Sequence, residues 1–517
     1  MALDTSTAGA AARTDRRGGG LVVALAVALA SLTLPLAVTP PGVALNAMAA
    51  DLGASPGAAQ WMLNAYNVTF AAFMLAAGGL ADLFGRKRVL TIGLWVFGAM
   101  SLLCAVLTDM VLIDVARGLQ GIGAAGVLTS GAAVLAAHYT GPARTRAFGM
   151  LGASFGFGLA LGPLVAGFLV DAAGWQSVFW MNVVIVAAAL LLSRRVPESS
   201  DPGAERVDWA GVVTFTLSLF LLTLAFVQGP ATGWTSWQAL GAIAGFLLFL
   251  ALFVVVELRQ RRPLFDLSLF RRPTFIAVVC QPFTITFGFV VLLVFLPPYF
   301  QGVGGVGAAE SAAVLLPLTL PVLLIPLVAG SVAARVPLRV MLGTSSLLIA
   351  AGSLWLVVLD PAGGITRVVA PLLVVGIGVG SAFGVMDNAA VSVVPPERAG
   401  MASGIFNTMR ITGEGIAIAG AASLLATLTA SGLGSRLPGV GARDAGAAGG
   451  EVVQGHVDVA VRELAGSPAG DVEKATALAD SLTSAMHTTF IVLALLALAG
   501  SVATFLVIRD RDLNPRA

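Results

Sequence analysis

Apolar residues recur along nearly the whole chain in runs of about 20, the length that an α-helix needs to cross about 30 Å of hydrocarbon. Short segments with charges, Gly or Pro separate the runs. This pattern predicts fourteen membrane-spanning helices and an all-α membrane protein. The spans lie near residues 21–38, 61–80, 89–107, 110–132, 148–170, 176–193, 209–228, 237–257, 274–299, 311–333, 340–359, 368–393, 401–429 and 487–508.

Composition supports this interpretation. Hydrophobic residues make up 57% of the 517 residues and charged residues only 11%, whereas soluble domains carry about 25% charged residues. A net charge of +2 without a basic patch predicts no nucleic-acid partner. The chain offers neither a phosphate-binding loop nor a nucleophile triad, and His138, His456 and His487 are scattered. We therefore expect no metal, no cofactor and no enzymatic activity.

The basic residues indicate topology. Arg13, Arg16 and Arg17 precede the first apolar run and imitate a signal peptide, but the many later spans favour an uncleaved first helix. Loops after even-numbered spans carry most of the Lys and Arg residues, which predicts cytoplasmic tails at 1–20 and 509–517. The long segment 430–486 is then extracytoplasmic, and its Gly, Ala and Asp content predicts a mobile surface loop.

Three pairs of similar segments reveal an internal repeat. GIGAAG at 121–126 is echoed at 376–381, TRAFGM at 145–150 is echoed at 397–402, and the third pair is GGLADLFGRKR at 78–88 with AGSVAARVPLR at 329–339. The offsets are nearly equal, so we expect two parallel six-helix bundles with a substrate site between them at the midplane. The bundles would occupy 21–193 and 274–508, with two inserted helices at 209–257.

GGLADLFGRKR follows the second span and resembles the G-x-L-a-D-x-x-G-r-k signature of the major facilitator superfamily. For that family the resemblance implies that the Asp caps and salt-bridges a neighbouring helix and so latches the bundles at the cytoplasmic side. An ordinary positive-inside loop is the alternative for the basic cluster alone. Leu83 departs from the pattern. The candidate gate residues are Gly78, Asp82, Gly85, Arg86, Lys87 and Arg88.

The fourth span, LIDVARGLQGIGAAG, carries Arg117 and Gln120 among apolar residues. A buried arginine costs at least about 2.5 kcal/mol unless it is paired or hydrated, which marks it as a functional candidate. The run resembles the R-x-x-q-G motif of proton-coupled transporters in the superfamily, whose arginine tunes a neighbouring carboxylate. Asp114 at i,i+3 is a possible partner. Alternatively, Arg117 ties helices together.

The fifth span fits G-x8-G-x3-G-P-x2-G-G, with Ala166 replacing one glycine. Small residues at i,i+4 allow helices to approach closely, and a proline bends the helix there. The complete pattern resembles the antiporter motif of drug exporters. Its residues here are Gly149, Gly158, Gly162, Pro163 and Gly167.

Together these motifs resemble the fourteen-span drug/proton antiporters of the major facilitator superfamily. The resemblance implies a monomer in a bacterial cytoplasmic membrane that exports a hydrophobic drug or antibiotic in exchange for protons. Trp61, Tyr66 and Gln120 are candidate substrate contacts, although Trp61 also suits an interfacial belt. Family members that expel cations commonly carry an Asp in the first span, and this chain has Ala37 at the corresponding position. Neutral, zwitterionic or weakly acidic substrates therefore fit this chain better than permanently cationic ones.

Three acids remain inside predicted spans as proton-coupling candidates: Asp114, Asp387 and Glu414. A carboxyl group removed from water favours its neutral form, so it can carry a proton at pH 7. Glu414 falls near the midplane of its span, within RITGEGIAIAG, with Arg410 at i,i+4. A permanent pair with Arg410 would keep Glu414 ionised, whereas an arginine that exchanges partners would suit coupling. The rival functions are import of a small metabolite and a membrane enzyme or scaffold.

Overall fold

The computed structural model describes residues 5–54, 56–200, 208–260, 267–333, 335–360, 364, 366–395, 398–437, 439–509 and 512. Their regular structure is helical. The N-terminal half contains α1 (Thr5–Leu36), α2 (Thr39–Asp51), α3 (Pro56–Phe84), α4 (Arg86–Val106), α5 (Met110–His138), α6 (Gly141–Ala173) and α7 (Ser177–Ser193). Two further helices follow, α8 (Trp209–Thr232) and α9 (Trp237–Arg259).

The C-terminal half begins with the 3-10 helix η1 (Leu267–Arg271) and alternates long helices with short ones. Its helices are α10 (Pro273–Gly302), α11 (Ala308–Ala313), α12 (Leu316–Val332), α13 (Leu338–Trp355), η2 (Leu356–Val358), α14 (Thr366–Phe383), α15 (Met386–Ser392), α16 (Ala399–Arg436), α17 (Ala442–Val453), α18 (Val457–Glu463) and α19 (Asp471–Val507).

The number of spans agrees with the prediction. Within the described ranges, twelve helices are long and apolar enough to cross a membrane, and α7 and α12 are shorter apolar helices. Counting those two gives the predicted fourteen. The expected all-α membrane fold is therefore confirmed.

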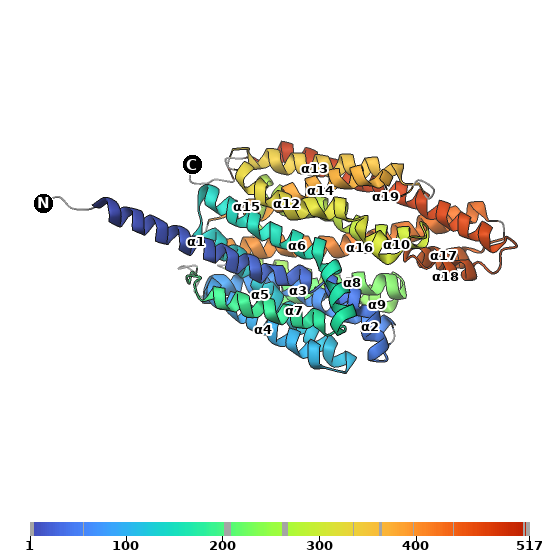
Figure 1. The fold of residues 1–517 in the computed structure, drawn as a ribbon, viewed down its shortest axis with the longest axis horizontal. Coiled ribbons are helices and arrows are strands. Elements are labelled where there is room, and N and C mark those ends of the chain that lie inside the picture. The colour runs from blue at the N-terminus through green and yellow to red at the C-terminus, as the bar shows by residue number, and fades with distance from the viewer. Residues whose placement is uncertain are drawn as a thin grey trace.

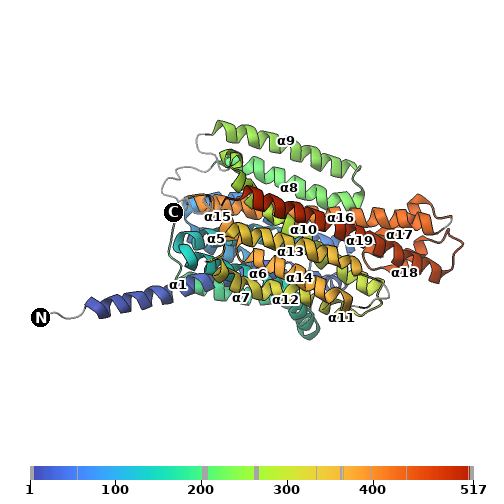
Figure 2. The same ribbon diagram turned by 90° about the horizontal axis from the view of Figure 1, so that it is seen from above.

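The helices form two bundles that lie side by side, α1–α7 in one and α10–α19 in the other (Figure 1). Each half has its own apolar core. At the interface α3 packs against α16, and α6 packs against α12. The inserted pair α8 and α9 lies to one side (Figure 2), where α8 contacts both α3 and α16. The start of α1, the end of α19 and α15 lie at one end of the molecule, and α17 and α18 at the other.

Segment 430–486, expected to be a loop, is instead largely helical: it holds the end of α16, α17, α18 and the start of α19. The prediction of a loop was wrong because the many Gly and polar residues of this segment obscured apolar residues that recur at helical spacing. Ala445, Ala448 and Val452 share one face of α17, are buried, and belong to the core of the C-terminal half. Burial of such a face stabilises a helix of otherwise weak propensity.

Two other predicted segments contain detail that the expectation lacked. The predicted tail 1–20 is helical from Thr5 onward, and the apolar part of this helix begins at Gly20, next to the predicted start of the first span at 21. The predicted span 368–393 divides into α14 and α15, with a turn at Gly384 and Val385. A β carbon added to Gly384 would lie 2.7 Å from Cβ of Ala329, so the chain passes close to α12 at this turn.

Candidate functional site

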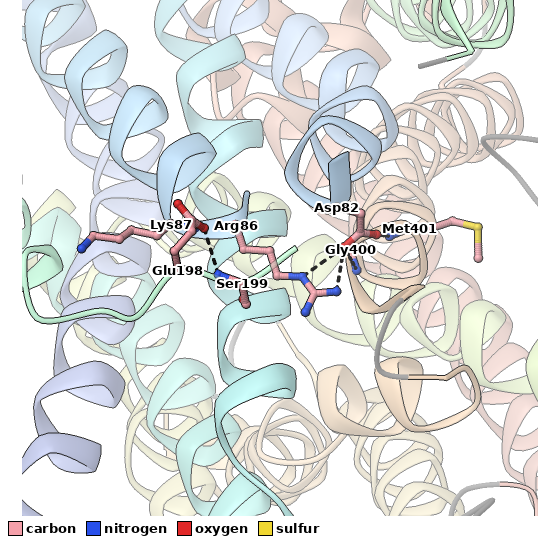
Figure 3. Close-up of polar contacts among 7 residues, drawn as sticks. All are labelled: Asp82, Arg86, Lys87, Glu198, Ser199, Gly400 and Met401. Carbon is pink, nitrogen blue, oxygen red and sulfur yellow. Dashed lines mark hydrogen bonds and ion pairs between the residues drawn. The ribbon is translucent and has the colours of Figure 1, made fainter. Parts of the chain in front are cut away.

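Asp82 lies in the last turn of α3 and connects the two bundles. Its Oδ1 accepts from Nε and Nη2 of Arg86 at 3.1 and 2.9 Å, and also from the backbone N–H of Gly400 at 3.3 Å. Its Oδ2 accepts from the backbone N–H of Met401 at 3.0 Å (Figure 3). The carboxylate thus caps the N-terminus of α16, where unpaired N–H groups and the helix dipole favour negative charge. We call this set of contacts the latch, and the end of the molecule that carries it the gate end.

Small residues make the latch possible. A β carbon on Gly78 would lie 2.4 Å from the carbonyl oxygen of Gly400, and one on Gly400 would lie 2.5 Å from Oδ1 of Asp82. Contacts this short are forbidden to real side chains, so α3 and α16 meet backbone to backbone. The role expected for Gly78 thus has a direct steric basis.

Sequence reasoning missed Glu198, which holds the other side of the same turn. Its carboxylate accepts from the backbone N–H groups of Lys87 at 3.0 Å and Arg88 at 3.2 Å, and so caps α4. Gly85 precedes α4 with φ of 109°, and a β carbon there would lie 2.7 Å from this carboxylate. Glu198 stands out in the sequence as an acid beside basic residues. The backbone group that it binds, the N–H of Lys87, lies 111 residues away, so the sequence alone does not identify the contact.

The glycines of the α6 motif have different neighbours. A β carbon on Gly149 would lie 2.7 Å from the carbonyl oxygen of Pro326 in α12, across the bundle interface. One on Gly158 would meet Pro35 of α1 at 2.4 Å, and one on Gly162 would meet Thr39 of α2 at 2.3 Å. Gly167 has nothing within 4 Å. The motif therefore joins α6 both to its own bundle and to the other one.

Two glycines outside the motif approach the C-terminal half still more closely. β carbons on Gly152 and Gly156 would lie 2.4 and 2.2 Å from the carbonyl oxygens of Phe383 and Val322. These two residues share a face of α6 because they are four residues apart. Pro163 lies inside α6, which continues through it to Ala173.

Arg117 lies wholly inside the N-terminal bundle. It donates from Nε to the carbonyl oxygen of Met62 at 3.0 Å, from Nη2 to that of Ala37 at 2.8 Å, and from Nη1 to Oε1 of Gln120. Its Cζ lies 4.5 Å from the centre of the Tyr66 ring. These contacts tie α3, α5 and the turn that follows α1 together. Among the described residues Asp114 forms no ion pair with Arg117, and its buried Oδ1 accepts no hydrogen bond.

The three candidate substrate-contact residues differ in how far their side chains are buried. Tyr66 and Gln120 are fully buried, and Gln120 donates to Oγ of Ser101 at 2.6 Å. Their polar atoms and ring faces are therefore occupied by the bundle itself. Trp61, at the start of the predicted span, is half-buried. Of the three, Trp61 alone keeps a partly open side chain.

Arg410 in α16 pairs with an acid from another helix. Its Nη1 lies 3.8 Å from Oδ2 of Asp387 in α15, and the two side chains are 2% and 5% exposed. Its Cζ also lies 4.5 Å from the centre of the Phe155 ring, which belongs to α6 in the other bundle. Within the described chain neither terminal nitrogen of Arg410 donates a hydrogen bond, and Oδ1 of Asp387 accepts none. The pair is buried but loosely bonded.

Glu414 lies one turn further along α16 and is half-buried. Among the described residues no ion pair within 4.0 Å joins it to Arg410. Its face of α16 points toward the N-terminal bundle, since Ile411, three residues earlier in the same helix, packs against the core of that bundle. The structure thus separates two acids: Asp387 holds Arg410, and Glu414 faces the interface between the bundles.

Comparisons with known proteins agree on the family. Residues 21–418 match the family model described as Major Facilitator Superfamily. The chain is 33% identical over 372 residues to the multidrug resistance protein Stp of Mycobacterium tuberculosis, covering 71% of this chain and 68% of that protein. It is 31% identical over 451 residues to the tetracenomycin C resistance and export protein of Streptomyces glaucescens, covering 83% and 81%.

Solved structures show the same fold. The proton:xylose symporter XylE superposes with a TM-score of 0.60 at 12% identity, over 96% of this chain and 98% of that one. The human organic anion transporter MFSD10 superposes with a TM-score of 0.56 at 15% identity, over 93% and 99%. These two proteins handle different solutes, so the likeness identifies architecture and not substrate.

Proposed function

The chain belongs to the Major Facilitator Superfamily, and we propose that it exports a hydrophobic drug or antibiotic in exchange for protons. The observation that carries the proposal is the position of Glu414. It is a half-buried carboxyl group at the bundle interface, on the helix that the latch holds, and the nearby arginine is paired with another acid. Relatives named for drug resistance and export support the direction of transport.

Helix α16 links the proton site to the gate. Met401, whose N–H binds Asp82, and Glu414 are separated by 13 residues, or about 20 Å of helix. A rigid helix of this length transmits a movement at one point to the other. Protonation of Glu414 removes a negative charge from the interface, and the bundles then rock about the close α6–α12 contacts. This sequence of events couples one proton to one opening of the latch.

Arg410 and Asp387 stabilise the site in this scheme. A guanidinium paired with Asp387 is not held by Glu414, which leaves Glu414 free to exchange protons. Moving one charge across 100 mV is worth about 2.3 kcal/mol, which a single coupled proton supplies to transport.

The charges of the N-terminal bundle support a proposal for the class of substrate. The first span carries no acid, and the carbonyl oxygen of Ala37 there accepts from Arg117. A permanently cationic substrate would find no counter-charge at this position. We therefore propose a neutral, zwitterionic or weakly acidic compound, with Trp61 as an aromatic contact.

The gate end is proposed to face the cytoplasm of a bacterial cell. The basic residues Arg86, Lys87, Arg88 and Arg194 gather there, as the positive-inside rule requires. With the latch closed, access to the interface is from the extracytoplasmic side, where protons enter.

Reconstituted vesicles test the proposal. The purified protein is placed in proteoliposomes with an internal pH-sensitive dye, and a panel of hydrophobic antibiotics is added. We expect proton movement that depends on both the protein and the compound. Absence of proton movement across a broad panel would contradict antiport. Uptake into vesicles of known orientation separates export from import of a small metabolite.

A further inference from the structure

A groove runs along the outer face of the N-terminal bundle, between α4 and α7, away from the interface helices α3, α6, α12 and α16. Its cavity measures about 770 Å³. Its walls are apolar, and two basic residues lie at one end. The lining includes Lys87, Trp95, Ala99, Leu102, Ala187 and Arg194. We propose that this groove binds one anionic glycerophospholipid from the membrane leaflet at the gate end.

The length of the groove matches a single lipid. The lining residues of α4 run from Lys87 to Leu102, which is about 22 Å of helix. Half of a bilayer's hydrocarbon thickness is about 15 Å, which leaves the remainder for a headgroup at the surface. A molecule lying in the groove would therefore extend from the headgroup layer to the middle of the bilayer, as a lipid of one leaflet does.

The shape of the groove suits an alkyl chain. A β carbon on Gly98 would lie 2.8 Å from Cγ1 of Val186, so the two helices touch there and close the floor. Beside this contact Ala99 and Ala187 are small and exposed. Trp95 is 64% exposed and forms one wall. Small side chains flanked by a large ring leave a channel for a flexible apolar chain.

Charge distinguishes an anionic lipid from other hydrophobic molecules. Nζ of Lys87 donates to the carbonyl oxygen of Arg194 at 3.1 Å, and both residues line the end of the groove. Arg88 and Arg195 are exposed close by. Glu198 is a nearby acid, and its carboxylate is occupied by the N-terminus of α4 and by Arg88, whose Nε lies 3.8 Å from Oε2, so that Lys87, Arg194 and Arg195 make up the surplus. The surplus of positive charge at this end attracts a phosphate-containing headgroup, and anionic leaflets concentrate such headgroups.

Native mass spectrometry of the detergent-purified full chain tests the site, with phosphatidylglycerol and phosphatidylcholine of identical chains as probes. We expect phosphatidylglycerol to bind at least about tenfold more tightly than phosphatidylcholine. Arg194→Gln should reduce phosphatidylglycerol affinity several-fold, and Arg195→Gln, which removes the same charge outside the groove, should have a much smaller effect. Equal binding of the two lipids, or equal effects of the two substitutions, would overturn the proposal.

A second variant tests the apolar channel. Ala187→Trp places an indole in the groove from an exposed position, so it should displace the alkyl chain and lower phosphatidylglycerol retention. A monodisperse elution profile and an unchanged unfolding temperature establish that the variant is folded; if it is unfolded, Ala99→Leu replaces it. Full retention of phosphatidylglycerol in a folded variant would contradict a lipid in this groove. Competition by an uncharged drug that is indifferent to Arg194→Gln would assign the groove to a drug instead.

Discussion

The guanidinium of Arg410 pairs with Asp387, which lies 23 residues earlier in the chain, and the Nη1–Oδ2 distance is 3.8 Å. Glu414, one helical turn from Arg410 in α16, forms no ion pair with it among the described residues. One acid therefore neutralises the buried arginine, and the other remains at the bundle interface. This division of roles is the basis for assigning proton coupling to Glu414.

The pairing predicts a specific pattern of stability. Asp387→Asn leaves Arg410 as an uncompensated buried charge, and breaking such a pair costs about 3 kcal/mol. We expect Asp387→Asn to lower the thermal unfolding midpoint in detergent. Adding Arg410→Met should recover most of the loss, because the unpaired charge disappears as well. Independent, additive effects of the two substitutions would show that the residues are not coupled.

The latch predicts a shift between conformations. Asp82→Asn loses the ion pair with Arg86 and weakens the cap on α16, and hydrogen bonds to a charged group contribute about 1.5–3 kcal/mol. We expect an increase of about tenfold or more in the population open at the gate end. Distances between spin labels on the gate-end tips of the two bundles measure this.

Asp109→Asn provides the control for the latch. Asp109 caps α5 through the backbone N–H of Leu112, at 2.9 Å, and is exposed. Asp109 makes the same kind of capping contact as Asp82, but within one bundle. The Asp109→Asn substitution should therefore leave the distribution of spin-label distances unchanged. An unchanged distribution in Asp82→Asn would contradict the role given to the latch.

The glycines of α6 provide a matched pair within a single motif. Gly149→Ala puts a β carbon 2.7 Å from the carbonyl oxygen of Pro326, so α6 and α12 cannot keep their contact. Gly167→Ala adds the same group where nothing lies within 4 Å. We expect efflux to fall strongly in the first variant and to remain near wild type in the second. Drug resistance in cells with matched expression measures both; similar behaviour of the two variants would refute the close-contact explanation.

Much of the fold follows from the sequence. The fourteen spans were predictable because each apolar run has the length that a bilayer requires. The family motif predicted that Asp82 caps and salt-bridges a neighbouring helix. It did not identify the partners in α16, because the carboxylate of Asp82 accepts from the backbone N–H groups of Gly400 and Met401, and every residue except proline has such a group.

The candidate site was harder to predict where contacts join distant segments. Arg117 has Asp114 nearby in sequence, but it instead donates to carbonyl oxygens of Met62 and Ala37. Such acceptors are present at every residue, and only the packing of α1 and α3 selects these two. The partner of Arg410 depends on the turn at Gly384, which carries Asp387 back beside α16.

The most direct test of the central claim compares wild type with Glu414→Gln in proteoliposomes under an imposed pH gradient. Glutamine preserves the shape of the side chain and cannot exchange a proton. We predict that the gradient drives drug accumulation in wild type and not in Glu414→Gln, while drug binding measured separately stays within a few-fold. Gradient-driven accumulation in Glu414→Gln equal to that of wild type would contradict the assignment of proton coupling to this residue.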